Sequence, residues 1–504
     1  MNMKKHVCTI TLLIWPLLAA SAGTPTDGER VHAFETGLRP AVLVQGAPGT
    51  TWTLEQRMAH WKIPGVSVAV IRNGRVAWAR GYGVKEAGTN DRVDADTVFS
   101  VGSVSKVGAA AVTLRLVDAG RLALDRDVND YITRWKVPAS AYTVVRPVTL
   151  RGILSHSAGL SVSGFPDFQP GDALPGIVDT LQGRPPAKTE AVRVIESPGT
   201  TFRYSGGGTT IEQLVIEEQT GLSFPEAARR YVLEPLHMGR STYENPLPAS
   251  HGNIARAHDA QGKPTALPRG WESMPETAAS GLWTTPGDYA KLVIALIESY
   301  RGARDAFIST TLARDMMTEV GPSRVGLGPF LDGHGLTRRF SHSGANDSYR
   351  AWMEGHLATG NGAVIFTNGS NGTRLIPEVR RAIAAAEGWA MTGSLVVPKV
   401  EISAAQLEEF AGIYAVRRAD RVLETRQSHV PKIAYRVFVE NGRLRLADAG
   451  AGEGSVALIP EGPLQFVAED DSSVRIEFVR GYDGKLAALV NRLEDYAVQA
   501  DKAR

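Results

Sequence analysis

A serine and a lysine three residues apart give this sequence its clearest chemical signal. Ser103 and Lys106 begin and end the tetrad Ser103-Val104-Ser105-Lys106, and on a helix this spacing places two side chains on one face. A serine hydroxyl becomes a good nucleophile only when a base removes its proton. A partly buried lysine with little compensating charge can lose its own proton near neutral pH and act as that base. The spacing therefore predicts that Ser103 accepts an acyl group and that Lys106 activates it.

Taken alone, the tetrad has a second interpretation, because serine–lysine pairs at this spacing are common by chance. In that alternative Ser103 caps a helix and Lys106 is a solvent-exposed surface residue. Apolar residues at three- and four-residue steps predict a helix over residues 103–119, with Gly120 as its stop. The start of such a helix offers backbone N–H groups and a positive field, which suit a developing oxyanion.

Strand patterns lie on both sides of this helix in the sequence. Residues 65–83 predict a β-hairpin, because alternating apolar residues flank the turn dipeptide Asn73-Gly74. Ala351–His356 and Ala363–Thr367 predict two more short strands. The Pro- and Gly-rich residues 161–199 predict a long surface excursion, which is either a functional loop beside the site or a plain connector.

Several further motifs accompany the tetrad in a fixed order. They are Thr97–Gly102, Thr149–Leu160, Pro198-Gly199, Tyr204-Ser205-Gly206, Leu233–Gly239, Gly281–Pro286 and His342-Ser343-Gly344-Ala345. Together with the tetrad they resemble the serine β-lactamase family in its class C and DD-peptidase branch, which also contains esterases and D-aminopeptidases. The resemblance covers roughly residues 50–385.

The resemblance implies roles for individual residues. Ser103 would be the nucleophile and Lys106 its partner, while the phenol of Tyr204 would relay a proton between the base and the leaving group. A phenol suits this role only if nearby cations lower its pKa. His156, in the preceding loop motif, is interpreted as a structural hydrogen-bonding residue.

The resemblance also implies a substrate-binding strand. His342-Ser343-Gly344 takes the position of the family's Lys-Thr-Gly strand, where the glycine would let a substrate backbone lie close. The oxyanion hole would consist of the backbone N–H groups of Ser103 and Ala345.

Two residues depart from the family pattern. Gly206 stands where the family has asparagine, which removes an amide that bonds both the lysine and the substrate. His342 replaces a permanent cation that helps to bind a substrate carboxylate, and a histidine is mostly neutral above pH ~6.5. Both changes weaken the case for an efficient β-lactamase and favour a peptidase, amidase or esterase.

The implied fold class is α+β. We expect an antiparallel sheet flanked by helices plus a helical subdomain, as in β-lactamases and transpeptidases, over residues 23–392. Residues 393–504 predict a separate C-terminal antiparallel β domain, a small barrel or sandwich. Its expected strands are Tyr435–Val439, Arg443–Leu446, Leu464–Val467, Val474–Val479 and Leu486–Val490.

The first residues predict a signal peptide over 1–22. Lys4 and Lys5 precede the mostly apolar run Thr9–Leu18, and small residues follow. The run is short for a membrane span, so we expect export to the periplasm and no stable membrane span after cleavage, although a retained N-terminal anchor is the alternative. Cys8, the sole cysteine, lies in this segment, so the mature chain would have no disulfide and no cysteine–zinc site.

Composition narrows the possible functions. The formal net charge of +2 falls to zero when the signal lysines are removed, and no basic run predicts nucleic-acid binding. No motif predicts a metal or another cofactor, and the oligomeric state stays open. We therefore expect an exported serine hydrolase that cleaves a small-molecule or peptide substrate through a Ser103 acyl-enzyme. D-amino-acid peptides or related amides are the first candidates. An esterase with the same site, and a slowly acylated or inactive penicillin-binding or scaffold protein, are the alternatives.

Overall fold

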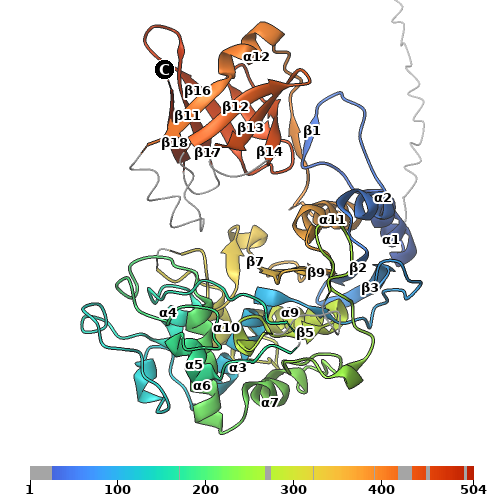
Figure 1. Cartoon of the computed structure of the whole chain (residues 1–504). Helices are drawn as coiled ribbons and strands as arrows, with labels where there is room; N and C mark the ends of the chain where they lie inside the picture. Colours follow the sequence, from blue (N-terminus) through green and yellow to red (C-terminus); the bar gives the residue numbers. More distant parts are fainter. Residues whose placement is uncertain are drawn as a thin grey trace, which may run out of the picture.

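The computed structural model describes residues 25–169, 171–266, 274–321, 323–390, 392–417, 434–449, 454–492 and 497–503. It contains an α+β body and, beyond it, a β-barrel formed by the C-terminal residues (Figure 1). The predicted signal peptide lies outside the described residues. Within them, no helix is long and apolar enough to cross a membrane.

A six-stranded antiparallel sheet forms the middle layer of the body. In sheet order the strands are β3 (Arg75–Gly83), β2 (Gly65–Arg72), β9 (Gly362–Thr367), β8 (Arg350–His356), β7 (Arg339–Ala345) and β6 (Phe330–Asp332). The predicted hairpin is confirmed as β2 and β3. Asn73 and Gly74 both have positive φ angles, of 52° and 75°, which the tightest hairpin turn requires.

Helices cover both faces of this sheet. Val66, Val68 and Val70 of β2 pack toward α1 (Asp27–Thr36), α2 (Leu54–Trp61) and α11 (Gly372–Glu387). The alternate residues Ala69 and Ile71 belong to the second core, with α9 (Pro286–Arg301) and the rest of the helices. Alternation of this kind follows from the two-residue period of a strand whose two faces are both buried.

The second core surrounds the helix α3 (Ser105–Asp118), with α6 (Gly206–Thr220) and α8 (Thr277–Ser280) against it. Each of the first ten residues of α3 is buried, as expected for a helix enclosed on all sides. The smaller elements are α4 (Leu150–Leu154), α5 (Ile177–Gln182), α7 (Phe224–Ala228), α10 (Thr310–Met316), η1 (Gly102–Val104), η2 (Val128–Asp130), η3 (Arg229–Leu233), η4 (Ala249–His251), η5 (Gly335–Thr337), β4 (Phe99–Ser100) and β5 (Trp283–Thr284).

The C-terminal β domain is a closed eight-stranded antiparallel barrel, as the prediction allowed. Its strands are β11 (Gly412–Val416), β12 (Ala434–Glu440), β13 (Arg443–Asp448), β14 (Ser455–Pro460), β15 (Gln465–Ala468), β16 (Arg475–Arg480), β17 (Leu486–Arg492) and β18 (Ala497–Lys502), and β18 pairs with β11. The sequence analysis did not identify β11, β14 and β18. Phe410, from α12 (Ala404–Phe410), packs against Phe466 and Phe478 in the apolar barrel core.

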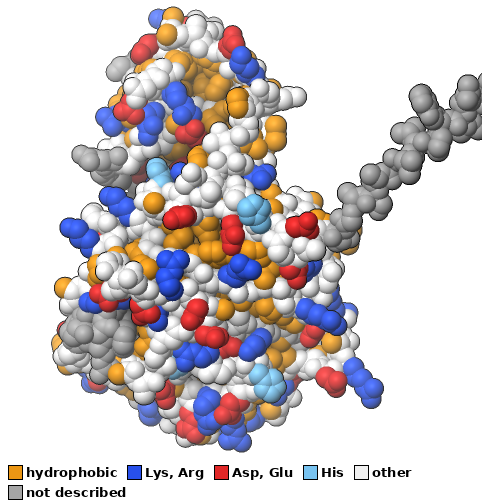
Figure 2. Space-filling view, turned by 90° about the vertical axis from the view of Figure 1, so that its right-hand side faces the viewer, with side chains coloured by type: hydrophobic (Ala, Val, Ile, Leu, Met, Phe, Trp, Pro, Cys, Tyr) orange, Lys and Arg blue, Asp and Glu red, His pale blue; other side chains and the backbone are white. Residues whose placement is uncertain are grey.

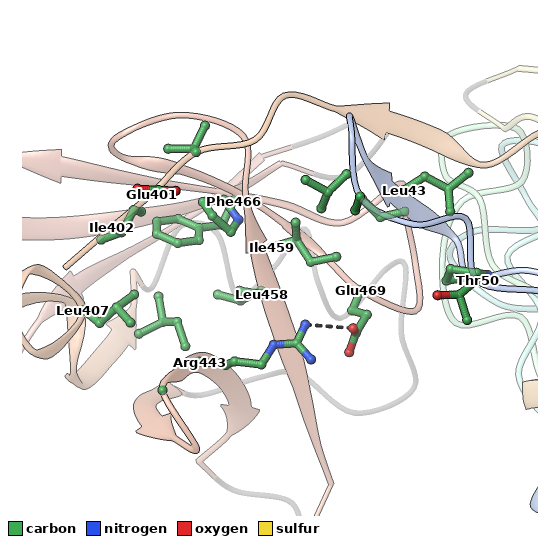
Figure 3. Close-up of a pocket in the computed structure, with 18 of the residues that line it drawn as sticks. Leu43, Thr50, Glu401, Ile402, Leu407, Arg443, Leu458, Ile459, Phe466 and Glu469 are labelled. Atoms are coloured by element: carbon green, nitrogen blue, oxygen red, sulfur yellow. Dashed lines mark hydrogen bonds and ion pairs between the residues drawn. The ribbon is translucent and has the colours of Figure 1, made fainter. Parts of the chain in front are cut away.

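A short parallel pair lies between the body and the barrel. β1 (Val42–Val44) pairs with β10 (Leu395–Val397), and Val42 and Val397 pack on Ile459 and Val467 of the barrel. Beside this pair lies an open, largely apolar hollow of about 670 Å³, with the Arg443–Glu469 ion pair at its edge (Figure 3). The pair therefore links the N-terminal segment to the start of the C-terminal domain.

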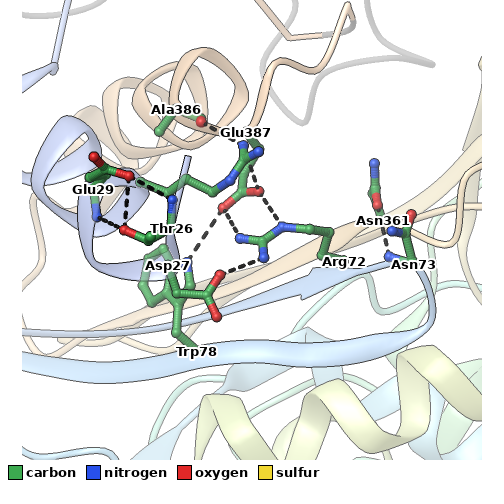
Figure 4. A network of polar contacts seen from close by, with 10 residues as sticks. Thr26, Asp27, Glu29, Arg72, Asn73, Trp78, Asn361, Ala386 and Glu387 are labelled. Atoms are coloured by element: carbon green, nitrogen blue, oxygen red, sulfur yellow. Dashed lines mark hydrogen bonds and ion pairs between the residues drawn. The ribbon is translucent and has the colours of Figure 1, made fainter. Parts of the chain in front are cut away.

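A network of ion pairs, only partly buried, connects helices α1 and α11 to strand β2. Arg72 of β2 donates from Nε to Glu387 Oε2 at 2.8 Å and from Nη1 to Asp27 Oδ1 at 2.5 Å (Figure 4). Arg30 of α1 approaches the same Glu387 carboxylate at 3.6 Å. On the surface, by contrast, Lys and Arg side chains are interspersed with Asp and Glu over the face in Figure 2.

Candidate active site

Ser103 lies in the 3₁₀ turn η1, directly before α3, rather than within the α-helix itself. Gly102 has a φ of 50°, and a Cβ placed on it would lie 2.7 Å from the backbone of Ala345. A Cβ on Gly344 would collide with the carbonyl oxygen of Val101. The two glycines therefore let the turn and strand β7 touch backbone to backbone, which brings Ser103 beside Ala345.

This contact corrects the reason expected for Gly344. The sequence analysis assigned the glycine to close approach of a substrate backbone, but the turn that carries Ser103 occupies that face. Ser343 and Ala345, the residues on either side of Gly344, are exposed. The open face of β7 is thus the one on which Ser343 and Ala345 lie.

Lys106 points at Ser103. Its Nζ donates to Ser103 Oγ at 3.1 Å and to the carbonyl oxygen of Ala279 at 2.9 Å. The side chain belongs to a residue only 5% exposed, so the alternative of a solvated surface lysine is wrong. Among the described residues, no carboxylate pairs with Lys106 within 4.0 Å, so the Ser103 hydroxyl and the Ala279 carbonyl are the hydrogen-bond partners of the amine.

Tyr204 lies against Lys106, just before α6. The Lys106 Nζ is 5.1 Å from the centroid of the half-buried Tyr204 ring. The ring also contacts His156, with centroids 4.2 Å apart, and stacks toward Phe330 at 6.4 Å. The hydroxyl, the amine and the phenol predicted from sequence are therefore brought together in one place.

His156 supports this tyrosine. Its Nδ1 accepts a hydrogen bond from the Ser205 backbone N–H at 3.2 Å, which confirms the predicted structural role. Burial lowers the pKa of His156 well below its ordinary value, and the charges of Lys106 and His342 lower it further. The imidazole is consequently neutral and holds the backbone at the start of α6.

His342 is a buried neutral side chain on β7. Burial lowers the pKa of His342 to about 4, and the charge of Lys106 acts in the same direction. Its Nδ1 lies 2.5 Å from the Ser343 carbonyl oxygen, whereas its Nε2 is buried without a hydrogen-bond partner. Phe330 packs on its ring with centroids 5.3 Å apart. The sequence analysis expected a histidine that is mostly neutral above pH ~6.5, and desolvation extends this neutral range down to about pH 4.

The structure explains why residue 206 is glycine. A Cβ at Gly206 would lie 2.9 Å from the ring of Phe165 and 3.3 Å from the carbonyl oxygen of Ser163. An asparagine side chain has no room there, because the 161–199 excursion fills the position. That excursion lies beside the site, so it is more than a distant connector.

Sequence reasoning missed one carboxyl group behind the base. Glu212 of α6 is buried and accepts a hydrogen bond from Thr113 Oγ1 of α3 at 2.6 Å. Burial raises the pKa of Glu212 to about 8, although the hydrogen bond and the Lys106 charge oppose the shift. At pH 7 the Glu212 carboxyl is therefore mostly neutral and adds little negative charge to the site. The described residues contain no group of three or more His, Cys, Asp or Glu arranged to hold a metal.

Comparison with known proteins gives relatives that share this architecture. The penicillin-binding protein 4 of Amycolatopsis lactamdurans is 30% identical over 260 residues, which are 49% of this chain and 63% of that protein. The unguisins hydrolase ungD of Aspergillus violaceofuscus is 27% identical over 297 residues, 53% of this chain and 49% of that protein. This chain therefore spans between half and two thirds of the length of these relatives.

Solved structures agree in fold. The octameric penicillin-binding protein homologue from Pyrococcus abyssi has a TM-score of 0.56 and 21% identity, covering 88% of this chain and 98% of that one. The D-amino acid amidase from Ochrobactrum anthropi has a TM-score of 0.55 and 18% identity, covering 71% and 99%. The family model described as Beta-lactamase matches residues 53–387. With this match over most of the α+β body, the chain belongs to the beta-lactamase family.

Proposed function

We propose that this protein is an exported serine hydrolase that cleaves amide or ester bonds through an acyl-enzyme on Ser103. The observation that carries the proposal is the 3.1 Å contact between Lys106 Nζ and Ser103 Oγ in a largely buried position. D-amino-acid peptides and related amides are the proposed substrates, in line with the amidase among the structural neighbours.

The proposed reaction has two steps. Lys106 acts as the base that takes the proton of Ser103 Oγ, and the oxygen attacks the substrate carbonyl carbon. The backbone N–H groups of Ser103 and Ala345 stabilise the oxyanion, while Tyr204 passes a proton to the departing nitrogen or oxygen. Water then attacks the Ser103 ester, which releases the acid and restores the free serine.

The neutral His342 favours one kind of leaving group. A cation at this position would attract a carboxylate on the departing half of the substrate, as in a carboxypeptidase. His342 carries no charge above pH ~4 and lies against Phe330. Leaving groups without a carboxylate, such as ammonia, simple amines and alcohols, are therefore the better fit.

An esterase with the same residues is the second candidate. Its supporting observation is Phe165, whose ring takes the place of the amide that usually recognises an amide substrate. An ester needs no such hydrogen bond. The third candidate is a slowly acylated or inactive penicillin-binding or scaffold protein. Turnover requires fast hydrolysis of the acyl-enzyme, and a protein in which acylation or this hydrolysis is slow would bind a penicillin without turning it over.

Active-site labelling combined with a substrate panel tests these candidates. Intact-mass spectrometry after fluorophosphonate treatment should show one adduct on the wild type and none on Ser103→Ala. Initial rates on D-amino-acid amides, a D-Ala-D-Ala peptide, a cephalosporin and short-chain nitrophenyl esters then separate amidase, peptidase, β-lactamase and esterase. An unlabelled wild type, or a labelled Ser103→Ala, contradicts the proposal.

Periplasmic location rests on the segment 1–22. The proposed cleavage follows Ala22, so the mature chain would begin at Gly23. Fractionation of a bacterial host with intact-mass analysis of the recovered chain checks both the cleavage point and the compartment. Recovery of the uncleaved chain in the membrane fraction would favour a retained anchor instead.

A further inference from the structure

Unpartnered polar atoms gather on the segments around Ser103. Buried polar groups are nearly always hydrogen-bonded, so such atoms call for an explanation. Among the described residues, three of the buried side-chain atoms without a partner lie on the segments that hold Lys106 and Tyr204: Glu276 Oε2, Thr277 Oγ1 and His342 Nε2. A bound substrate would supply the missing partners.

Glu276 is the acidic member of this set. It is 3% exposed and directly precedes α8, three residues before Ala279, whose carbonyl oxygen holds Lys106. The charged groups that act on its carboxyl are Asp167 and Lys188, both on the 161–199 excursion. Burial, together with the charge of the neighbouring Asp167, raises the pKa of Glu276 to about 7, although a backbone hydrogen bond and the charge of Lys188 oppose the shift. The Glu276 carboxyl is thus buried on the segment that holds Lys106 and is close enough to Asp167 to feel its charge.

Strand β7 tells which half of a substrate these carboxyls face. His342 lies in the middle of β7, three residues before Ala345. Its ring centroid is 6.3 Å from that of Tyr204, the proposed proton donor to the leaving group. At the C-terminal end of β7, just beyond Ala345, the backbone N–H of Asp347 donates to Asp167 Oδ2 at 2.6 Å. A substrate lying along β7 thus has its leaving group toward His342 and its acyl half toward Asp167 and Glu276.

We propose that Glu276, with Asp167 beside it, binds the α-ammonium group of the substrate's acyl residue, so that the enzyme acts on amides or esters of amino acids whose amino group is free. This inference rests on the proposed serine-hydrolase function and narrows its substrate class. An ammonium has three N–H donors and no acceptor, which suits an acceptor oxygen that has no partner. Its positive charge also offsets the repulsion between the two carboxyls.

A matched pair of substrates tests the inference. We expect the wild type to hydrolyse D-alanine p-nitroanilide with a kcat/KM about 10²-fold above that of N-acetyl-D-alanine p-nitroanilide. In Glu276→Gln that preference should fall below about threefold through loss on the free-amine substrate alone, because a buried charge pair loses one partner. Asp172→Asn is the control: it removes a carboxylate that pairs with Lys188 on the excursion, at an exposed position, and should keep the preference.

The outcomes separate this inference from the function on which it rests. Equal rates on both anilides in the wild type, or an equal loss on both in Glu276→Gln, overturn the ammonium site even if Ser103 is labelled. Absence of fluorophosphonate labelling in the wild type overturns the hydrolase function, and the ammonium site with it. If Glu276→Gln does not fold, the wild-type comparison with propionyl p-nitroanilide, which lacks the amine, decides: similar rates overturn the inference, and a strong preference for the amine supports it.

Discussion

The core around α3 and the core of the C-terminal barrel differ in the polar groups that they bury. The core around α3 encloses Lys106, Glu212 and Glu276 together with two neutral histidines. In the described part of the barrel, Asn491 is the one buried polar side chain, and it donates to the Tyr435 hydroxyl at 3.1 Å. A buried polar or charged group costs stability unless it is paired, so the difference fits the placement of the proposed catalytic residues in the core around α3 rather than in the barrel.

The largest effect on the catalytic rate is expected at Lys106, the proposed base in the core around α3. Lys106→Ala should lower kcat/KM on a nitrophenyl ester at least about 10²-fold, in line with general-base contributions. Lys291→Ala removes a half-buried lysine of α9 that pairs with Asp288 and should leave the rate unchanged. Steady-state kinetics on both variants check this, and near-wild-type activity of Lys106→Ala would remove the lysine from the mechanism.

The glycine contact between η1 and β7 gives the next largest effect. Gly344→Ala forces a Cβ against the Val101 carbonyl and should shift the serine turn from Ala345, with a rate loss of about 10-fold to 10²-fold. Gly239→Ala is the control, because nothing lies within 4 Å of its added Cβ. Labelling rates with a fluorophosphonate measure the effect. Equal labelling of both variants would show that the contact does not position Ser103.

The barrel should respond in stability and not in rate. Phe478 is fully buried, and Phe478→Ala should destabilise the barrel by about 3–5 kcal/mol while kcat/KM stays within about twofold. Tyr482→Ala, at a fully exposed aromatic, should change stability by less than about 0.5 kcal/mol. Urea unfolding and ester hydrolysis test both statements. A large rate loss in Phe478→Ala would break the division between the two cores.

The smallest effect concerns pH. The pKa of His342 is about 4 in the folded chain and near 6.5 when unfolded, so the unfolded state binds more protons between these values. Stability should therefore fall as the pH drops from about 6.5 to about 4. His342→Gln removes its part of this fall, while the buried His156 retains its own. Unfolding midpoints at pH 7, 5.5 and 4.5 measure the difference, and identical pH profiles would contradict it.

Local patterns predicted much of this architecture. The dipeptide Asn73-Gly74 favours a tight turn by itself, and the three-residue spacing of Ser103 and Lys106 is visible in the sequence. Both features could therefore be predicted without knowledge of the tertiary structure. The barrel was expected because several strand–turn–strand units follow one another. β11 and β14 were missed because neither Gly412–Val416 nor Ser455–Pro460 shows a clean alternation of apolar and polar residues.

The parts that escaped prediction depend on contacts between distant segments. Glu212 lies in a helix sequence where a carboxylate usually faces solvent, and only the packing of α6 on α3 buries it. Phe165 fills the space at Gly206 from a loop about 40 residues earlier, which no local pattern encodes. No sequence pattern singles out Glu276, because its proposed role depends on a buried carboxyl oxygen without a hydrogen-bond partner, which only the folded structure reveals.

The pairing of β1 with β10 affects how the chain can be divided. Strand β10 begins at Leu395, past the boundary expected near residue 392, whereas its partner β1 belongs to the N-terminal segment. A fragment cut at that boundary would leave the backbone edge of Val42–Val44 unpaired and strip Val42 of its apolar neighbours. A hydrolase fragment meant for expression on its own should therefore extend past Val397 or begin after β1.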